Sequence, residues 1–210
     1  MTYNSNKGSQ KSHNQAEETL ENLLDNAIAK DLCTGIAASV SIDGRLLWSH
    51  CSGFTAREEL ALSKPIENDG KTSNSIIAPI DPETRFDVAS MTKPLSTSLL
   101  ILKALQAGAL NLQDSLGKYL PEVNYRTGQI PLLALLTHSS GLPAIPALHS
   151  FFADSGRLDR SLALERLFSI EPQFAIGKHV VYSCTGYIFL GVLLERISGM
   201  LLGELFQKEI

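Results

Sequence analysis

Apolar residues recur at helical spacing early in the chain, and acidic residues precede them. Glu17 and Glu18 occupy the first turn of the predicted helix, where the helix dipole favours negative charge. Residues 1–14 are polar and predict a disordered tail. The apolar positions of this helix are Leu20, Leu23, Leu24, Ala27 and Ile28.

The pattern then changes to two β-rich runs, from Gly35 to Ile42 and from Arg45 to Cys51. Asp43-Gly44 joins them, and Asp-Gly between two such runs is a strong hairpin signal. Because both faces carry apolar residues, the sequence predicts a sheet that is covered on both sides. These residues are Ile36, Val40, Ile42 and Leu47 on one face, and Ala37, Leu46 and Trp48 on the other.

Residues 62–80 are rich in Ser, Asn, Gly and Pro, which predicts a surface insertion loop. A helix is predicted to begin near Ser90, because Pro94 is tolerated in a first turn, and to stop at Gly108. Its inward-facing residues are predicted to be Leu95, Leu99, Leu102 and Leu105. Further helices are predicted at 132–137, 162–168 and 187–197.

Composition narrows the class of protein. A chain of 210 residues with 44% hydrophobic content can bury a core and fits one domain. The net charge of −4, without a basic run, argues against nucleic acid or an anionic membrane as partner. The polar N-terminus does not resemble a signal peptide, and no apolar run approaches the ~18 residues of a membrane span. A cytoplasmic location is therefore expected.

The segment Ser90-Met91-Thr92-Lys93 carries the candidate chemistry. At the start of a helix this spacing places a hydroxyl and an amine on one face, one turn apart, as a nucleophile and its base require. The same spacing occurs at Ser115 and Lys118, where Gly117 and Pro121 indicate a capped turn with a solvated lysine. Spacing alone does not separate the two pairs, because Ser90 could equally be a helix cap and Lys93 a surface lysine.

Three segments in order resemble the serine β-lactamase-like superfamily, in its branch of class C β-lactamases, D-alanyl-D-alanine carboxypeptidases and esterases. They are RFDVASMTKP at 85–94, LLTHSSGLP at 135–143 and YSCTGY at 182–187. The resemblance implies an α+β fold, with an antiparallel sheet flanked by helices and an all-helical region. Residues 15–210 would form the N-terminal and central part of one such domain.

The resemblance also implies roles for individual residues. Ser90 would be the acylated nucleophile, Lys93 its base, and Tyr182 a relay of protons between Ser90 and the leaving group. A lysine titrates near ~10.4, so a lysine base requires burial or nearby positive charge to lower its pKa. No cofactor and no metal are expected. His138 is interpreted as a structural turn histidine.

Two features depart from the family pattern. Cys184 occupies a substrate-binding position where the family usually has Asn, and a thiol is a weaker hydrogen-bonding group, so an ester would be accepted more readily than an amide. A third motif, K-T-G or H-x-G, does not follow Tyr182. The C-terminal strands are therefore expected to be missing, which would leave a sheet edge open to self-association or complementation.

Two functions remain open at this stage. The first is a serine hydrolase that forms an acyl-enzyme with a small ester, amide or lactam, with an ester favoured. The alternative is a truncated or split, catalytically weak member of the family that acts as a non-enzymatic fragment or binding module. An unrelated α/β binding domain would require the order of the three segments to be a coincidence.

Overall fold

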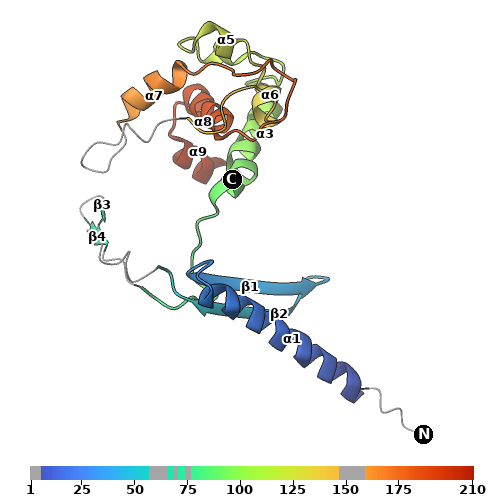
Figure 1. Cartoon of the computed structure of the whole chain (residues 1–210). Helices are drawn as coiled ribbons and strands as arrows, with labels where there is room; N and C mark the ends of the chain where they lie inside the picture. Colours follow the sequence, from blue (N-terminus) through green and yellow to red (C-terminus); the bar gives the residue numbers. More distant parts are fainter. Residues whose placement is uncertain (1–5, 57–65, 69–70, 74–76, 147–158) are drawn as a thin grey trace. The chain divides into compact units, whose positions relative to one another are not determined.

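The computed structural model describes residues 6–56, 66–68, 71–73, 77–146 and 159–210. The chain divides into two compact units, residues 1–87 and residues 88–210 (Figure 1). The boundary lies directly before the Ser90 segment, inside the range predicted as part of one domain. Each unit is built from the elements described below.

The first unit begins with the helix α1 (Asn6–Ala29). The predicted helix is confirmed, but residues 6–14 are helical where a disordered tail was predicted over 1–14; residues 1–5 lie outside the described residues. No proline interrupts this polar stretch. Once a helix is nucleated, each further residue adds a hydrogen bond at small cost, so the helix continues outward from its apolar part.

The predicted hairpin is confirmed as the antiparallel strands β1 (Gly35–Ile42) and β2 (Arg45–Gly53). Its register shifts between Val40 and Ser41, so that Val40 lies opposite Trp48. Residues opposite each other share a face, and an extra residue in one strand moves later side chains to the other face. The prediction that Val40 and Trp48 lie on different faces is therefore wrong.

The helix α1 covers one face of this hairpin (Figure 1). Trp48 Nε1 donates a hydrogen bond to Glu21 Oε1 over 3.4 Å, and His50 Nε2 lies 3.1 Å from Asp25 Oδ1. The other face carries small, exposed residues, Ala37, Ser39 and Ser49. Within the described part of the first unit, α1 covers one face of the hairpin, and cover of both faces stays a prediction.

About half of the predicted surface loop at 62–80 lies outside the described residues. Its described part includes two short antiparallel strands, β3 (Ile66–Asn68) and β4 (Lys71–Ser73). This stretch therefore contains a small hairpin where only a loop was predicted.

The second unit opens with the Ser90 segment, which is helical but irregular. A 3-10 turn, η1 (Ala89–Met91), precedes a π-helical turn, η2 (Lys93–Ser98), and the regular helix α3 (Leu99–Gln106). Pro94 cannot donate to the regular hydrogen-bond ladder, which accounts for the irregular start. Gly108, with φ of 70°, follows the helix end and confirms the predicted stop.

Three of the four residues predicted to face inward lie outside the core of the second unit. Leu100 and Ile101 are buried, whereas Leu102 is 57% exposed. Leu95 and Leu99 are exposed as well, and only Leu105 packs against the core. Four consecutive apolar residues, 99–102, surround the first turn of α3, and a π turn changes the rotation per residue, so a period of 3.6 does not carry across η2.

The core of the second unit forms around α8 (Cys184–Ser198). The predicted helices are confirmed as α6 (Leu132–Leu136), α7 (Arg160–Phe168) and α8. Three further helices were not predicted, namely α4 (Leu116–Tyr119), α5 (Tyr125–Gly128) and α9 (Leu202–Glu209). None of the described helices combines the length and apolarity needed to cross a bilayer.

Candidate active site

The backbone is strained at Ala89, directly before Ser90. Ala89 has φ of 44°, in the left-handed region that residues with a side chain rarely adopt. Such a conformation costs about 1–3 kcal/mol and persists where the surrounding structure imposes it, often at functional sites. The side chain of Ser90 that follows is exposed.

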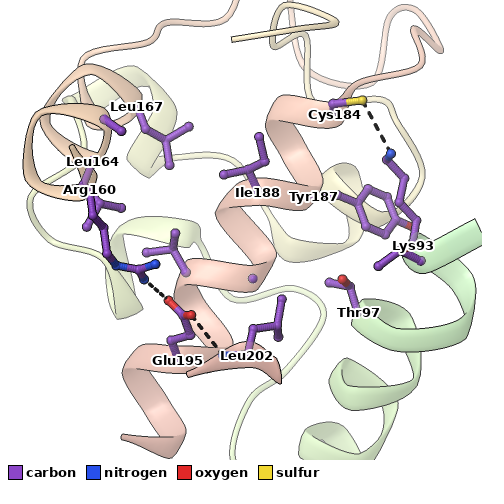
Figure 2. A pocket seen from close by; sticks show the side chains of 14 residues that line it. Lys93, Thr97, Arg160, Leu164, Leu167, Cys184, Tyr187, Ile188, Glu195 and Leu202 are labelled. Atoms are coloured by element: carbon purple, nitrogen blue, oxygen red, sulfur yellow. Dashed lines mark hydrogen bonds and ion pairs between the residues drawn. The ribbon is translucent and has the colours of Figure 1, made fainter. Parts of the chain in front are cut away.

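Lys93 is the centre of the site. Its Nζ donates a hydrogen bond to Ser90 Oγ over 3.3 Å. It donates another to Cys184 Sγ over 3.5 Å (Figure 2). The ring centroid of Tyr182 lies 5.0 Å from the same Nζ. The structure thus brings together all four residues that the sequence singled out, although Tyr182 and Cys184 come from a segment about ninety positions further along the chain.

The electrostatics of this group differ from the sequence expectation. Burial alone would lower the pKa of Lys93, but its interactions with Tyr182 and Cys184 outweigh burial and raise that pKa above its ordinary value. Hydrogen bonding to Lys93, and then to Ser90, lowers the pKa of the Tyr182 phenol. The lowered lysine pKa that a neutral lysine base requires is not found. The arrangement favours an ammonium group beside a readily ionised phenol.

Hydrogen bonds join the segment around Tyr182 to the loop that contains HSSGLP, residues 138–143. Ser183 caps α8, since its Oγ accepts a hydrogen bond from the Gly186 N–H over 3.1 Å. The same hydroxyl donates to the Pro143 carbonyl over 2.9 Å. The Cys184 N–H donates to the Ala144 carbonyl over 2.7 Å. Residues 182–184 are therefore fixed by an adjacent loop.

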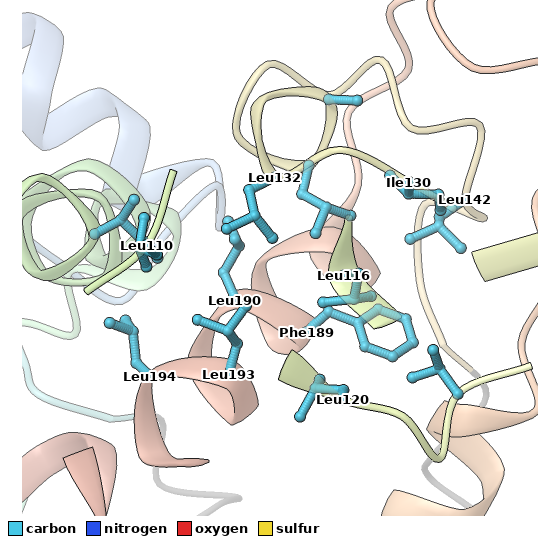
Figure 3. Packing of buried hydrophobic residues seen from close by; sticks show 14 of the residues in the cluster. Leu110, Leu116, Leu120, Ile130, Leu132, Leu142, Phe189, Leu190, Leu193 and Leu194 are labelled. Carbon is cyan, nitrogen blue, oxygen red and sulfur yellow. The ribbon is translucent and has the colours of Figure 1, made fainter. Parts of the chain in front are cut away.

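The opposite face of α8 is buried among apolar side chains (Figure 3). Phe189, Leu190 and Leu193 have no exposed surface, and they pack in one cluster with Leu116 and Leu120. Burial of these side chains contributes about 1.5–3 kcal/mol each relative to exposure. The helix that carries Cys184 at its first position is thus anchored in the core.

Gly141 allows the HSSGLP segment to turn close to the backbone of Phe174. Its φ is 77°, and a Cβ there would lie only 2.3 Å from the Phe174 carbonyl oxygen. No other residue fits without moving the backbone. The loop that holds residues 182–184 therefore depends on a glycine.

Sequence reasoning missed two residues of the site. Tyr187 lies one helical turn after Cys184, and its ring centroid is 5.8 Å from Lys93 Nζ. The spacing of three on a helix could have identified it. The His138 ring lies between the two tyrosines, with centroid distances of 4.7 Å to Tyr182 and 5.2 Å to Tyr187. His138 was interpreted as a structural residue only, and no pattern in the neighbouring sequence predicts the contact of its ring with the two tyrosines.

A cavity of about 350 Å³ adjoins Lys93 and Cys184 (Figure 2). An ion pair between Arg160 and Glu195 borders its other end, and Glu195 Oε1 also accepts a hydrogen bond from the Leu202 N–H over 3.0 Å. The lining between these ends is mostly apolar, from Ala163, Leu164, Leu167, Ile188, Val192 and Leu202.

The second Ser–Lys pair has a different environment. Ser115 precedes α4, and Lys118 Nζ forms an ion pair with Asp114 Oδ2 over 2.8 Å. The side chain of Lys118 is largely exposed. This pair is the surface turn that the sequence predicted. Among the described residues, no group of three or more His, Cys, Asp and Glu side chains could hold a metal ion.

Comparison with known proteins places these segments in context. A family model described as Beta-lactamase matches residues 20–210. The chain is 26% identical to the N-acetylmuramyl-L-alanine amidase of Bacillus subtilis over 206 residues, which cover 89% of this chain and 43% of that protein. Penicillin-binding protein 4* of the same organism is 29% identical over 172 residues, which cover 80% of this chain and 33% of that protein.

A solved structure agrees with these matches. The octameric penicillin-binding protein homologue from Pyrococcus abyssi aligns with a TM-score of 0.66 and 25% identity, covering 92% of this chain and 42% of that one. The chain therefore spans less than half the length of these relatives.

Proposed function

The chain belongs to the beta-lactamase family, and on that basis we propose that it acts as a serine hydrolase that forms an acyl-enzyme at Ser90. The family match confirms the predicted resemblance and fold class. The observation that carries the proposal is the contact of Lys93 Nζ with Ser90 Oγ, 3.3 Å apart, beside the ring of Tyr182. A serine requires a neighbouring base to become a nucleophile, and this group supplies one.

In the proposed reaction, Tyr182 is the proton acceptor and Lys93 remains an ammonium. The Ser90 proton moves to the Tyr182 phenolate as Oγ bonds to the carbonyl carbon of the substrate. Tyr182 then returns the proton to the leaving group, whose bond to carbon breaks, and an acyl-enzyme remains. Water releases the acyl group by the same steps in reverse order. This assignment replaces the sequence hypothesis of Lys93 as the base, because the pKa of Lys93 is raised and that of Tyr182 is lowered.

We propose an ester with an apolar acyl group as the substrate class. The thiol of Cys184 is a weak partner for a substrate amide, whereas an ester presents no N–H to satisfy. The apolar cavity next to Lys93 and Cys184 supports an acyl group that is a hydrocarbon rather than a charged chain.

The alternative function is a catalytically weak binding module of the same family. It is favoured by the Cys184 thiol, a weak hydrogen-bonding group that lies 3.5 Å from Lys93 Nζ. The octameric assembly described for the Pyrococcus abyssi homologue supports self-association as an accompanying proposal.

A covalent probe decides between the two functions. The protein is incubated with a fluorescent phosphonate or penicillin, together with Ser90→Ala and with Ser115→Ala as the matched control. The proposal expects labelling of the wild type and of Ser115→Ala, and none of Ser90→Ala. Equal labelling of all three, or of none, would contradict it.

A further inference from the structure

We infer that His138 is a positioning residue, which holds Tyr182 against Lys93 by binding the backbone on both sides of Tyr182. The His138 carbonyl accepts a hydrogen bond from the Val181 N–H over 2.9 Å. Its side-chain Nδ1 accepts another from the Ser183 N–H over 3.0 Å. One residue therefore binds the backbone N–H groups of both neighbours of Tyr182, Val181 and Ser183.

Tyr182 needs such support because it precedes the helix α8. Ser183 is the helix cap, so the hydrogen bonds of α8 do not hold Tyr182. Its side chain is 50% exposed, so packing restrains it only on one side. The His138 ring packs against that side. It is tilted by 37° to the Tyr182 ring, at a centroid distance of 4.7 Å.

The backbone of His138 is itself in a costly conformation. Its φ is 57°, in the left-handed region, which few residues with a side chain adopt, Asn, Asp and His most often among them. The strained residue is retained at the point where its carbonyl and its ring both reach the Tyr182 segment. The strain is thus linked to the contact with Tyr182.

The protonation state of the imidazole agrees with the acceptor role. Burial, and then the charge of Lys93, lower the pKa of His138. A neutral ring can leave Nδ1 unprotonated as an acceptor and carry its proton on Nε2. The other titratable groups that face the ring are Tyr182 and Tyr187.

A matched pair of variants separates the contribution of the His138 side chain from that of the His138 backbone. His138→Asn keeps an acceptor oxygen close to the position of Nδ1 and tolerates the left-handed conformation. His138→Gly also tolerates the conformation but has no acceptor and no ring. A difference between the two therefore reports the contribution of the side chain.

The readout is the ionisation of the Tyr182 phenol. It is measured by near-ultraviolet absorbance during a pH titration, from which the titration of Tyr182→Phe is subtracted. We expect the phenol of the wild type and of His138→Asn to ionise below the ordinary tyrosine pKa of ~10. In His138→Gly the pKa should return toward that value, because Tyr182 moves away from Lys93. An unchanged titration in His138→Gly would overturn the inference.

A measurement on the unaltered protein tests the same inference without variants, so it does not depend on whether the variants fold. Through-hydrogen-bond coupling between the Ser183 amide nitrogen and His138 Nδ1, measured by nuclear magnetic resonance on labelled protein, should be present. A proton on Nδ1 at neutral pH would contradict the inference.

The catalytic consequence rests on the proposed function. Since a displacement of about 1 Å can cost ~10²-fold in rate, His138→Gly should acylate about a hundredfold more slowly, and His138→Asn should recover most of that loss. If the wild type is not acylated at all, the proposed function fails, while the Tyr182 titration still decides the role of His138.

Discussion

Lys93 Nζ and Cys184 Sγ lie 3.5 Å apart, joined by a hydrogen bond between residues that are 91 positions apart in the chain. The thiol therefore contacts the lysine that also binds Ser90, and we propose that it contacts the substrate as well. An amide group in this place could donate and accept strong hydrogen bonds, whereas a thiol does both weakly.

Replacing Cys184 by Asn should widen the substrate range toward amides. The new amide group would pair with the substrate amide, which we expect to raise kcat/KM for an amide relative to the matching ester by about tenfold, equivalent to one good hydrogen bond. The measurement compares both substrates in wild type, Cys184→Asn and Cys184→Ala. An equal gain in Cys184→Ala would show that the amide group is not the cause.

The two lysines of the Ser–Lys pairs should differ in their effect on acylation. Lys93→Ala removes the ammonium beside Tyr182 and should slow acylation of Ser90 by about 10²–10⁴-fold. Lys118→Ala breaks only a surface ion pair with Asp114 and should leave the rate unchanged. Stopped-flow labelling of both variants checks this, and similar rates would remove Lys93 from the mechanism.

Acylation should rise with pH through the lowered pKa of Tyr182. Only the phenolate accepts the Ser90 proton, so the rate increases as pH passes upward through a value below the ordinary ~10. Lys93→Met removes the cation that lowers this pKa, so the rise should shift to higher pH. A pH–rate profile that is the same in Tyr182→Phe as in the wild type would exclude Tyr182 as the base.

Two glycines with positive φ should respond differently to alanine. At Gly108, with φ of 70°, a Cβ meets no atom within 4 Å, so Gly108→Ala should cost only the conformational strain of about 1–2 kcal/mol. At Gly141 the Cβ also collides with the Phe174 carbonyl, so the cost should reach about 2–5 kcal/mol. Urea denaturation gives both free energies of unfolding, and equal values would contradict the crowding at Gly141.

The cavity should set the length of acyl chain that is accepted. Ala163→Phe places a large side chain inside it, and we expect kcat/KM to fall for long-chain esters while short-chain esters are little affected. Leu162→Phe changes the neighbouring position on the same helix, whose side chain is exposed, and serves as the control. A chain-length series of chromogenic esters provides the measurement. A uniform loss across the series would argue against the cavity as the acyl site.

Local signals explain most of what the sequence predicted correctly. Asp43-Gly44 specified the hairpin turn, and Gly108 specified a helix end, because each depends on the backbone preferences of a few adjacent residues. The inward face of α3 and the pairing of Val40 with Trp48 could not be read in this way. A π turn and a bulge each change the phase of a pattern, so side chains beyond them face other directions than a constant period predicts.

The sequence by itself determined the contact between Ser90 and Lys93, since the two residues lie within one turn and local helical geometry brings them together. Only the tertiary structure decided what surrounds the pair. It brought Tyr182 and Cys184 to Lys93, and it fixed the direction in which the lysine pKa moves. It also placed His138 against Tyr182. A pKa and a long-range contact depend on the sum of neighbours from several segments, which no short stretch of sequence contains.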